Sequence, residues 1–221
     1  MPSYTLSALQ TKVLDLLDGN SAEFPLPNIT AVLNHGLARM NLQLGLQSTT
    51  VAVPGNTVAG QFAYSVPSGI EVPVRCDFQS QEISPLSFGR LARSYPTWAT
   101  DTSANLGPPA RWARLDLQSF IIHPADAYGG ALLEVTGIAP TTPLVNAGDV
   151  VGLEDQWAEC LIAYSRMRLL LKEGGRAFAE AVKAFAPYKA KIREASIWRD
   201  VNWSQFDLAM KQKPGAQRMP L

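Results

Sequence analysis

The chain has 221 residues, enough for one substantial hydrophobic core with extensions. Hydrophobic residues make up 47% of it and charged residues only 17%, which is typical of a folded protein with a weakly charged surface. Because 19 basic residues balance 19 acidic ones, no net positive field favours dedicated nucleic-acid binding, although neutrality suits DNA that slides past without sticking.

Cys76 and Cys160 are the only two cysteines, one in a strand-like segment and one on the apolar side of an expected helix. Neither a metal cluster nor a disulfide framework is indicated, and two buried free thiols are expected. No segment has the roughly 18 continuous apolar residues of a membrane span, and the first residues lack a secretory pattern. These features predict a protein kept in a cytosol-like compartment.

Two amphipathic helices are predicted near the N-terminus. Over residues 5–18, leucine and valine recur at helical spacing, and Gly19 follows as a stop. Asn28 is expected to cap the second helix, over residues 28–44, which stops at Gly45. The two helices should form an N-terminal helical hairpin.

A central antiparallel β region is predicted over about residues 48–138, because β-branched and aromatic segments alternate with turn residues. The expected strands are 49–53, 61–66, 70–78, 83–86, 111–115, 119–123 and 131–136. The first two strands should form a β-hairpin and the last three a meander. Pro73 weakens its strand or places it at an edge. The lack of βαβ alternation argues against a doubly wound nucleotide-binding fold.

A short helix and a long loop interrupt the β region. Ser87 is expected to cap a helix that ends near Ala92. Residues 95–110 are rich in Pro, Thr, Ser and Gly and contain Trp98. Because a tryptophan is costly to leave in water, Trp98 is expected either to pack beneath the loop or to contact a partner.

Two longer helices, over residues 153–173 and 176–198, are predicted to form a C-terminal helical hairpin broken at Gly174 and Gly175. The fold class is therefore α+β, with a single domain over residues 1–198. Residues 199–221 keep aromatic side chains without clear periodicity, which favours an extended arm that docks on a neighbouring subunit over local packing. The candidate partner-binding residues are Trp98, Trp198, Trp203, Phe206 and Met210.

No catalytic, cofactor or metal site is indicated. His35 lies off the apolar stripe of its helix, and His123 with Asp126 lacks the nucleophile motif that a triad needs. Asp101 and Glu134 are carboxylates that could serve a glycosidase pair, but the sequence gives no means of placing them close together. The glycine pairs of the chain are isolated and match no phosphate-binding motif.

The order of these segments resembles one known family, the head-to-tail adaptor (connector) proteins of tailed bacteriophages. The segments that carry the resemblance are residues 28–40, 60–68, 85–91, 109–112, 120–124, 132–136 and 157–164. No segment is specific alone, and their order and spacing over most of the chain carry the resemblance. The chain departs from shorter, mostly helical adaptors in its larger β region and in the aromatic segment after Trp198.

The resemblance implies a non-enzymatic virion subunit of the phage neck, assembled in the host cytoplasm. Such a subunit forms a ring, commonly of twelve copies, beneath the portal protein and offers a platform to a tail or nozzle protein. DNA passes through the lumen without sequence-specific binding, and no membrane or cofactor is involved. Two alternatives remain: another neck or tail-completion protein, and a carbohydrate-binding or hydrolytic module built on Asp101, His123, Asp126 or Glu134.

Overall fold

The computed structural model describes residues 4–18, 22–99, 106–151, 153, 155–173 and 177–211, without the side chains of residues 173 and 195–211. Contacts divide the chain into a helical unit, Met1–Leu44 with Thr142–Leu221, and a β unit, Gly45–Thr141. The α+β class is confirmed, with helices drawn from both ends of the chain and a curled sheet from its middle. The single domain over residues 1–198 stays a prediction.

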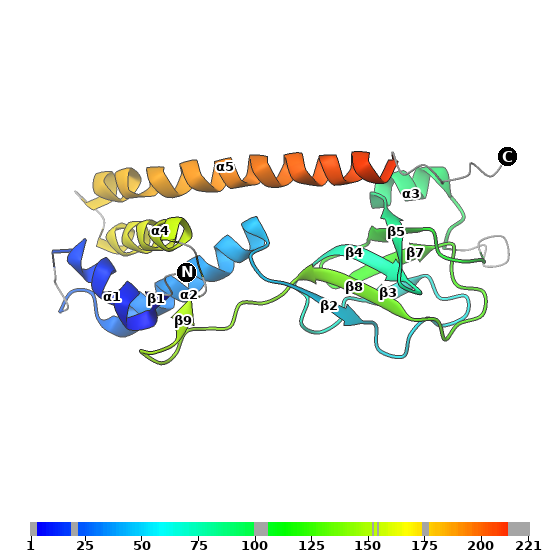
Figure 1. Ribbon diagram of the computed structural model, residues 1–221, viewed down its shortest axis with the longest axis horizontal. Coiled ribbons are helices and arrows are strands. Elements are labelled where there is room, and N and C mark those ends of the chain that lie inside the picture. Colours follow the sequence, from blue (N-terminus) through cyan, green and yellow to red (C-terminus); the bar gives the residue numbers. More distant parts are fainter. Residues whose placement is uncertain are drawn as a thin grey trace. The chain divides into compact units, whose positions relative to one another are not determined.

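The helical unit is built on α1 (Leu6–Asp15), α2 (Leu26–Leu44), α4 (Asp155–Glu173) and α5 (Ala177–Lys211) (Figure 1). α4 packs against α1, α2 and α5. A short antiparallel ladder between β1 (Tyr4–Thr5) and β9 (Val150–Val151) joins the N-terminal segment to the residues before α4. The sequence did not predict this ladder, and the two helical hairpins stay a prediction.

Local sequence explains where several helices begin. The Thr5 hydroxyl accepts a hydrogen bond from the backbone N–H of Ala8 at 3.2 Å and caps α1. Ser87 accepts from Arg90 at 3.3 Å and caps α3 (Phe88–Ser94), as predicted. α2 begins at Leu26 rather than after Asn28, because Pro27 fits the first helical turn, where its missing N–H is not needed.

The predicted end of the last helix near residue 198 is wrong. α5 continues past Trp198 to Lys211, so the first part of the predicted extended arm is helical. No proline or glycine interrupts the chain between Pro187 and Pro214, and helix propensity carries the backbone through the segment despite its weak periodicity. Residues 212–221 lie outside the described part of the chain.

The β unit is a curled sheet in which strands distant in sequence are neighbours. Its strands are β2 (Ser48–Ala52), β3 (Ala63–Ser65), β4 (Val72–Phe78), β5 (Gln81–Pro85), β6 (Arg111–Arg114), β7 (Ser119–His123) and β8 (Leu133–Ile138). Their order in the sheet is β2-β8-β4-β5-β6-β7-β3. Neighbouring strands are antiparallel except β5 and β6, which are parallel.

Two predicted strand pairings are wrong. β2 and β3 do not form a hairpin, since β2 pairs with β8 and β3 pairs with β7. β8 does not continue the β6–β7 meander, because it lies between β2 and β4. Alternating apolar residues identify a strand but not its partner, and the connection between β2 and β3 is too long to dictate a hairpin. Thr57 in that connection instead donates its N–H to the Ala131 carbonyl at 2.9 Å.

Pro73 lies in β4, the strand that this proline was predicted to weaken or to place at an edge. The β4–β8 register shifts between Pro73 and Arg75, and β5 pairs with β4 only from Cys76 onward. Pro73 therefore has no ladder partner on the β5 side and needs no N–H there. Gly137 of β8 lies opposite Pro73, and a Cβ on this residue would collide with the Val72 carbonyl oxygen.

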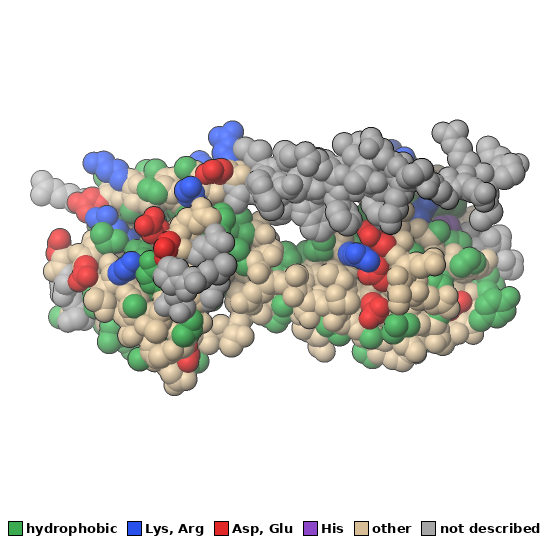
Figure 2. Space-filling view, viewed as in Figure 1, with side chains coloured by type: hydrophobic (Ala, Val, Ile, Leu, Met, Phe, Trp, Pro, Cys, Tyr) green, Lys and Arg blue, Asp and Glu red, His purple; other side chains and the backbone are tan. Residues whose placement is uncertain are grey.

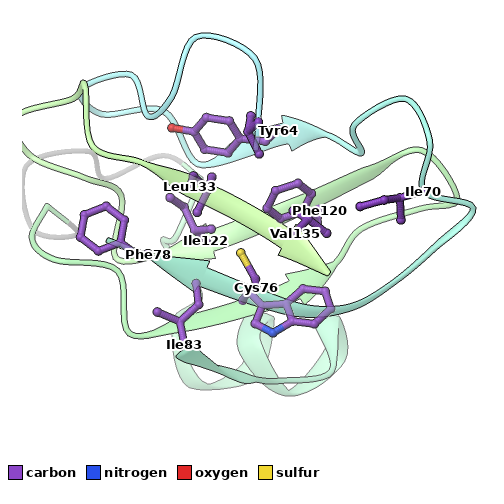
Figure 3. Packing of buried hydrophobic residues seen from close by; sticks show 11 residues of the cluster. Tyr64, Ile70, Cys76, Phe78, Ile83, Phe120, Ile122, Leu133 and Val135 are labelled. Atoms are coloured by element: carbon purple, nitrogen blue, oxygen red, sulfur yellow. The ribbon is translucent and has the colours of Figure 1, made fainter. Parts of the chain in front are cut away.

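The core of the β unit fills the inside of the curled sheet (Figure 3). Cys76, Phe120 and Val135 come from three separate strands, and each side chain is fully buried. The ring of Trp112 packs edge-on against Phe120, with centroids 6.4 Å apart. Apolar residues at alternate strand positions therefore face one interior, which is the arrangement that period-two patterning produces.

Candidate interaction groove

Trp98 of the predicted partner-binding set lies in the β unit and is half-buried. Its indole makes edge-to-face contacts with Phe62 and Phe88, at centroid distances of 6.2 Å and 5.9 Å. It also packs against a small buried cluster that includes Leu91 and Ile121. Local packing therefore accounts for much of the indole surface, and a partner contact through the rest stays a prediction.

The other four predicted residues, Trp198, Trp203, Phe206 and Met210, lie on the α5 backbone, and their side chains are outside the described set. α5 has 35 residues and α4 has 19, which at 1.5 Å per residue corresponds to about 52 Å and about 28 Å. α5 is thus much longer than the helix it packs against. Within its described side chains, the buried ones are Ala181, Tyr188 and Ile192.

The residues considered for hydrolytic chemistry do not form an open site. His123 and Asp126 are each 4% exposed. Asp126 accepts hydrogen bonds from the Thr57 hydroxyl at 2.5 Å and from the Tyr128 N–H at 3.1 Å, so it anchors a loop. Burial, together with the charge of Arg111, lowers the pKa of His123 below its usual value of 6.5.

Two carboxylates and two thiols remain as chemical candidates. Asp101 lies outside the described residues, and Glu134 is a half-buried residue of β8 opposite Asp77. Cys76 and Cys160 are buried free thiols, as predicted, and burial raises the pKa of Cys76 to about 12. Among the described residues, no group of three histidine, cysteine or acidic side chains is placed to hold a metal ion.

The helical unit carries an open groove of about 850 Å³ between α1, α4 and α5. Its lining residues are Lys12, Asp15, Leu16, Glu159, Ile162, Ala163, Arg166, Glu180, Lys183, Ala184 and Pro187. The residues from α4 and from α5 each follow the spacing i, i+3, i+4, i+7, so each helix contributes one continuous face to a wall. Such a groove between helices suits a helical or extended segment of a partner.

The groove is lined by apolar residues and by charged residues of both signs. Leu16 is 45% exposed, although leucine is a residue that folding normally buries. Three basic residues, Lys12, Arg166 and Lys183, and three acidic ones, Asp15, Glu159 and Glu180, line the groove. On the side of the helical unit drawn in Figure 2, acidic, basic and apolar side chains are likewise mixed.

Arg166 is the unusual residue of the groove. Its Nε is shielded from solvent and has no hydrogen bond partner within the part of the chain that is described. A buried donor without an acceptor typically costs about 1–3 kcal/mol, more when it is charged, so such groups usually mark a missing partner. The sequence did not predict this groove, because no pattern along one helix reveals what three helices form together.

The two units are an α+β arrangement, and the helical unit carries an open groove between helices, a form that a segment of another protein can occupy. The model of the SU10 adaptor protein family matches residues 4–211, and the chain belongs to this family. The predicted resemblance to phage head-to-tail adaptors is thereby confirmed, and the chain is a structural component of a virion. No curated protein matches the chain.

Within the described residues, no helix is both long and apolar enough to cross a membrane.

Proposed function

We propose that this chain is a subunit of an oligomeric ring in the neck of a phage, beneath the portal protein, where it joins the capsid to the tail. The observation that carries the proposal is the family match over residues 4–211. The ring holds twelve copies, as the resemblance to connector proteins implies. DNA passes through its lumen without sequence-specific contacts, and a tail or nozzle protein docks on the other side.

The balanced charge of the chain supports a role in which DNA moves. Each phosphate that a lysine or arginine neutralises releases counterions and adds affinity, which would slow a passing duplex. Nineteen basic and nineteen acidic residues leave no net attraction over the whole chain. A subunit of this composition can surround DNA without retaining it.

Closed rings need two different surfaces on each subunit, because a head-to-tail contact joins one patch to another patch of the neighbour. The groove of the helical unit is one candidate surface. The second is the C-terminal docking arm, residues 199–221, which begins on α5 and carries Trp203, Phe206 and Met210. Aromatic anchors of this kind often contribute on the order of 2 kcal/mol or more each to an interface.

The role is that of a structural partner and not of an enzyme, in keeping with the adaptor family. The subunit is made in the host cytoplasm and ends in the virion, where its partners are copies of itself, the portal protein and a tail or nozzle protein. Trp98 and Trp198 are further candidate contacts of the proposed interfaces.

Native mass spectrometry of the purified chain, alone and mixed with the portal protein of the same phage, tests the proposal. We expect either a ring or a monomer that joins the portal in several copies. A monomer that ignores the portal at every concentration would contradict it. Negative-stain microscopy of the mixture then gives the number of copies and checks the value of twelve.

A further inference from the structure

We infer that the groove between α1, α4 and α5 receives the distal part of α5, residues 198–210, from a second copy of this chain. The inference rests on the proposed ring and identifies the contact between its neighbouring subunits. Two features of the groove support the inference: its apolar lining residues and the unpaired Nε of Arg166. Two features of the distal part of α5 also support it: its length and its residue spacing.

The apolar lining of the groove suits large side chains. Ala163 of α4 and Ala184 of α5 occupy the same i+4 position in their two stripes, so each wall carries a small residue there. Leu16 and Pro187 add apolar surface beside them. A volume of about 850 Å³ accommodates several aromatic or methionine side chains from a helical partner.

The distal part of α5 offers residues of this kind at helical spacing. Trp203, Phe206 and Met210 follow the pattern i, i+3, i+7 along the helical backbone. Asp200 and Asp207 are also seven residues apart, and Trp203 lies between them in the sequence. The segment therefore combines two aspartates with three large apolar residues at helical spacing in the sequence.

Arg166 explains why the occupant carries acidic residues. A guanidinium whose Nε is buried and unpaired gains most from a carboxylate, which accepts charge-assisted hydrogen bonds. Asp200 and Asp207 supply carboxylates on the same segment that supplies the aromatic residues. The apolar and charged parts of the groove thus match one and the same helix segment.

The segment that fills the groove must come from another copy. α5 itself forms one wall of the groove through residues 180–187, and the same continuous helix continues to Lys211. Pro187 and Trp198 are about 16 Å apart along that helix, and Pro187 and Met210 about 35 Å. A helix cannot fold back into a groove that it lines, so the distal α5 that enters the groove is that of a neighbour. Repetition of this one contact around an axis closes a ring.

Crosslinking between two differently tagged forms of the full-length chain tests the inference. One form carries Ala184→Cys in the groove, and the other carries Phe206→Cys. The native Cys76 and Cys160 are buried, so the introduced thiols are the reactive ones. The control replaces Ala184→Cys by Phe178→Cys, since Phe178 is 58% exposed on the same helix but does not line the groove.

We expect a crosslinked product that carries both tags with Ala184→Cys, at least about tenfold more than with Phe178→Cys, in every sample that contains several copies of the chain. Equal yields with the two cysteines in such a sample would overturn the inference and leave the ring itself standing. A chain that never associates, alone or with the portal, would contradict the ring as well.

A charge variant provides an independent readout. Arg166→Gln should weaken self-association by roughly tenfold or more, because the carboxylates of the neighbour lose their partner. Arg168→Gln should leave self-association unchanged, since Arg168 is exposed on α4 and lies outside the groove. Equal effects of the two variants would count against the inference. Thermal unfolding of each variant verifies that the helical unit stays folded.

Discussion

Gly36 shows how one residue sets the distance between two helices. A Cβ at this position of α2 would lie 2.7 Å from Leu161 Cδ1 and 2.7 Å from Tyr164 Cδ1, both on α4. Both α4 residues are fully buried, so neither side chain has free space to move into. The close approach also brings the Tyr164 hydroxyl within 2.7 Å of His35 Nδ1. Only glycine permits this packing.

Gly36→Ala should therefore destabilise the helical unit by about 1–3 kcal/mol, through overpacking that outweighs the better helix propensity of alanine. Gly89→Ala is the matched control, because Gly89 also lies in a helix and a Cβ there meets nothing within 4 Å. This control should be neutral or stabilising by up to about 1 kcal/mol. Urea unfolding of both variants gives the comparison, and a Gly36→Ala variant as stable as the native chain would refute this account.

His123 should make the stability of the β unit depend on pH. Its pKa is lowered by burial and by Arg111, so the folded state disfavours the protonated ring, whereas the unfolded chain protonates near 6.5. Stability is then fully present above 6.5 and decreases as the pH falls toward the lower pKa of the folded state. The ring of Tyr95 packs on the His123 ring at a centroid distance of 4.1 Å and supplies no carboxylate to stabilise the protonated imidazole.

Chemical denaturation at a series of pH values between about 7.5 and 5 tests this dependence, compared with His123→Gln, which removes the titrating group. We expect the native chain to lose stability over this range more steeply than the variant. Parallel curves would show that other groups cause the loss. The comparison is needed because acidic residues also titrate at the lower end of the range.

At the scale of elements, the sequence predicted which segments are helices and strands better than it predicted their partners. Apolar periodicity located α1, α4 and the strands of the sheet, and Ser87 marked the start of α3. Strand order was not predictable, because β2 and β8 are paired by the shape of the whole curled sheet and by contacts such as Thr57 with Ala131. The end of α5 was not predictable from periodicity, because the segment after Trp198 is weakly amphipathic although it contains no helix breaker before Pro214.

The helical distal part of α5 leads to a prediction about that element. Ser204→Pro should break the helix between Trp203 and Phe206, because proline removes a backbone hydrogen bond and clashes with the preceding turn. Helix content measured by circular dichroism should fall, and self-association should be lost. The melting temperature of the helical unit should not change, since its described buried residues on α5 end at Ile192.

Ser204→Ala is the matched control, because alanine raises helix propensity at the same position. It should keep both helix content and self-association. If Ser204→Pro assembles as well as Ser204→Ala, the helical form of this segment has no part in assembly. Hydrogen exchange of residues 195–211 in the two variants locates the structural change.

At the scale of the whole molecule, the candidate site was only half visible in the sequence. The aromatic residues of the distal part of α5 could be identified as interaction residues, because Trp203 and Phe206 are unusual in a segment without a core. The groove could not be identified, because Lys12 of α1 lies far along the chain from Ile162 of α4 and Ala184 of α5. The sequence left Asp126 open only as part of an alternative hydrolytic module, and its role as a buried anchor for the loop at Thr57 becomes visible only after folding.

Two tryptophans should separate assembly from folding. Trp203→Ala should reduce the yield of the oligomer, or of the complex with the portal, by roughly tenfold or more, because an interface anchor is lost. The melting temperature should stay unchanged. Trp98→Ala should instead lower folding stability, destabilising the β unit by about 2–4 kcal/mol, because its indole packs on Phe62 and Phe88.

Native mass spectrometry and differential scanning calorimetry on the same two proteins measure both properties. The contrast is informative because each variant removes the same side chain and serves as the control for the other. An unchanged complex yield for Trp203→Ala would remove the distal part of α5 from the proposed interface. A loss of folding stability in Trp203→Ala would instead show that Trp203 packs within its own subunit. Comparing complex yield with melting temperature therefore distinguishes a residue of the interface from a residue of the fold.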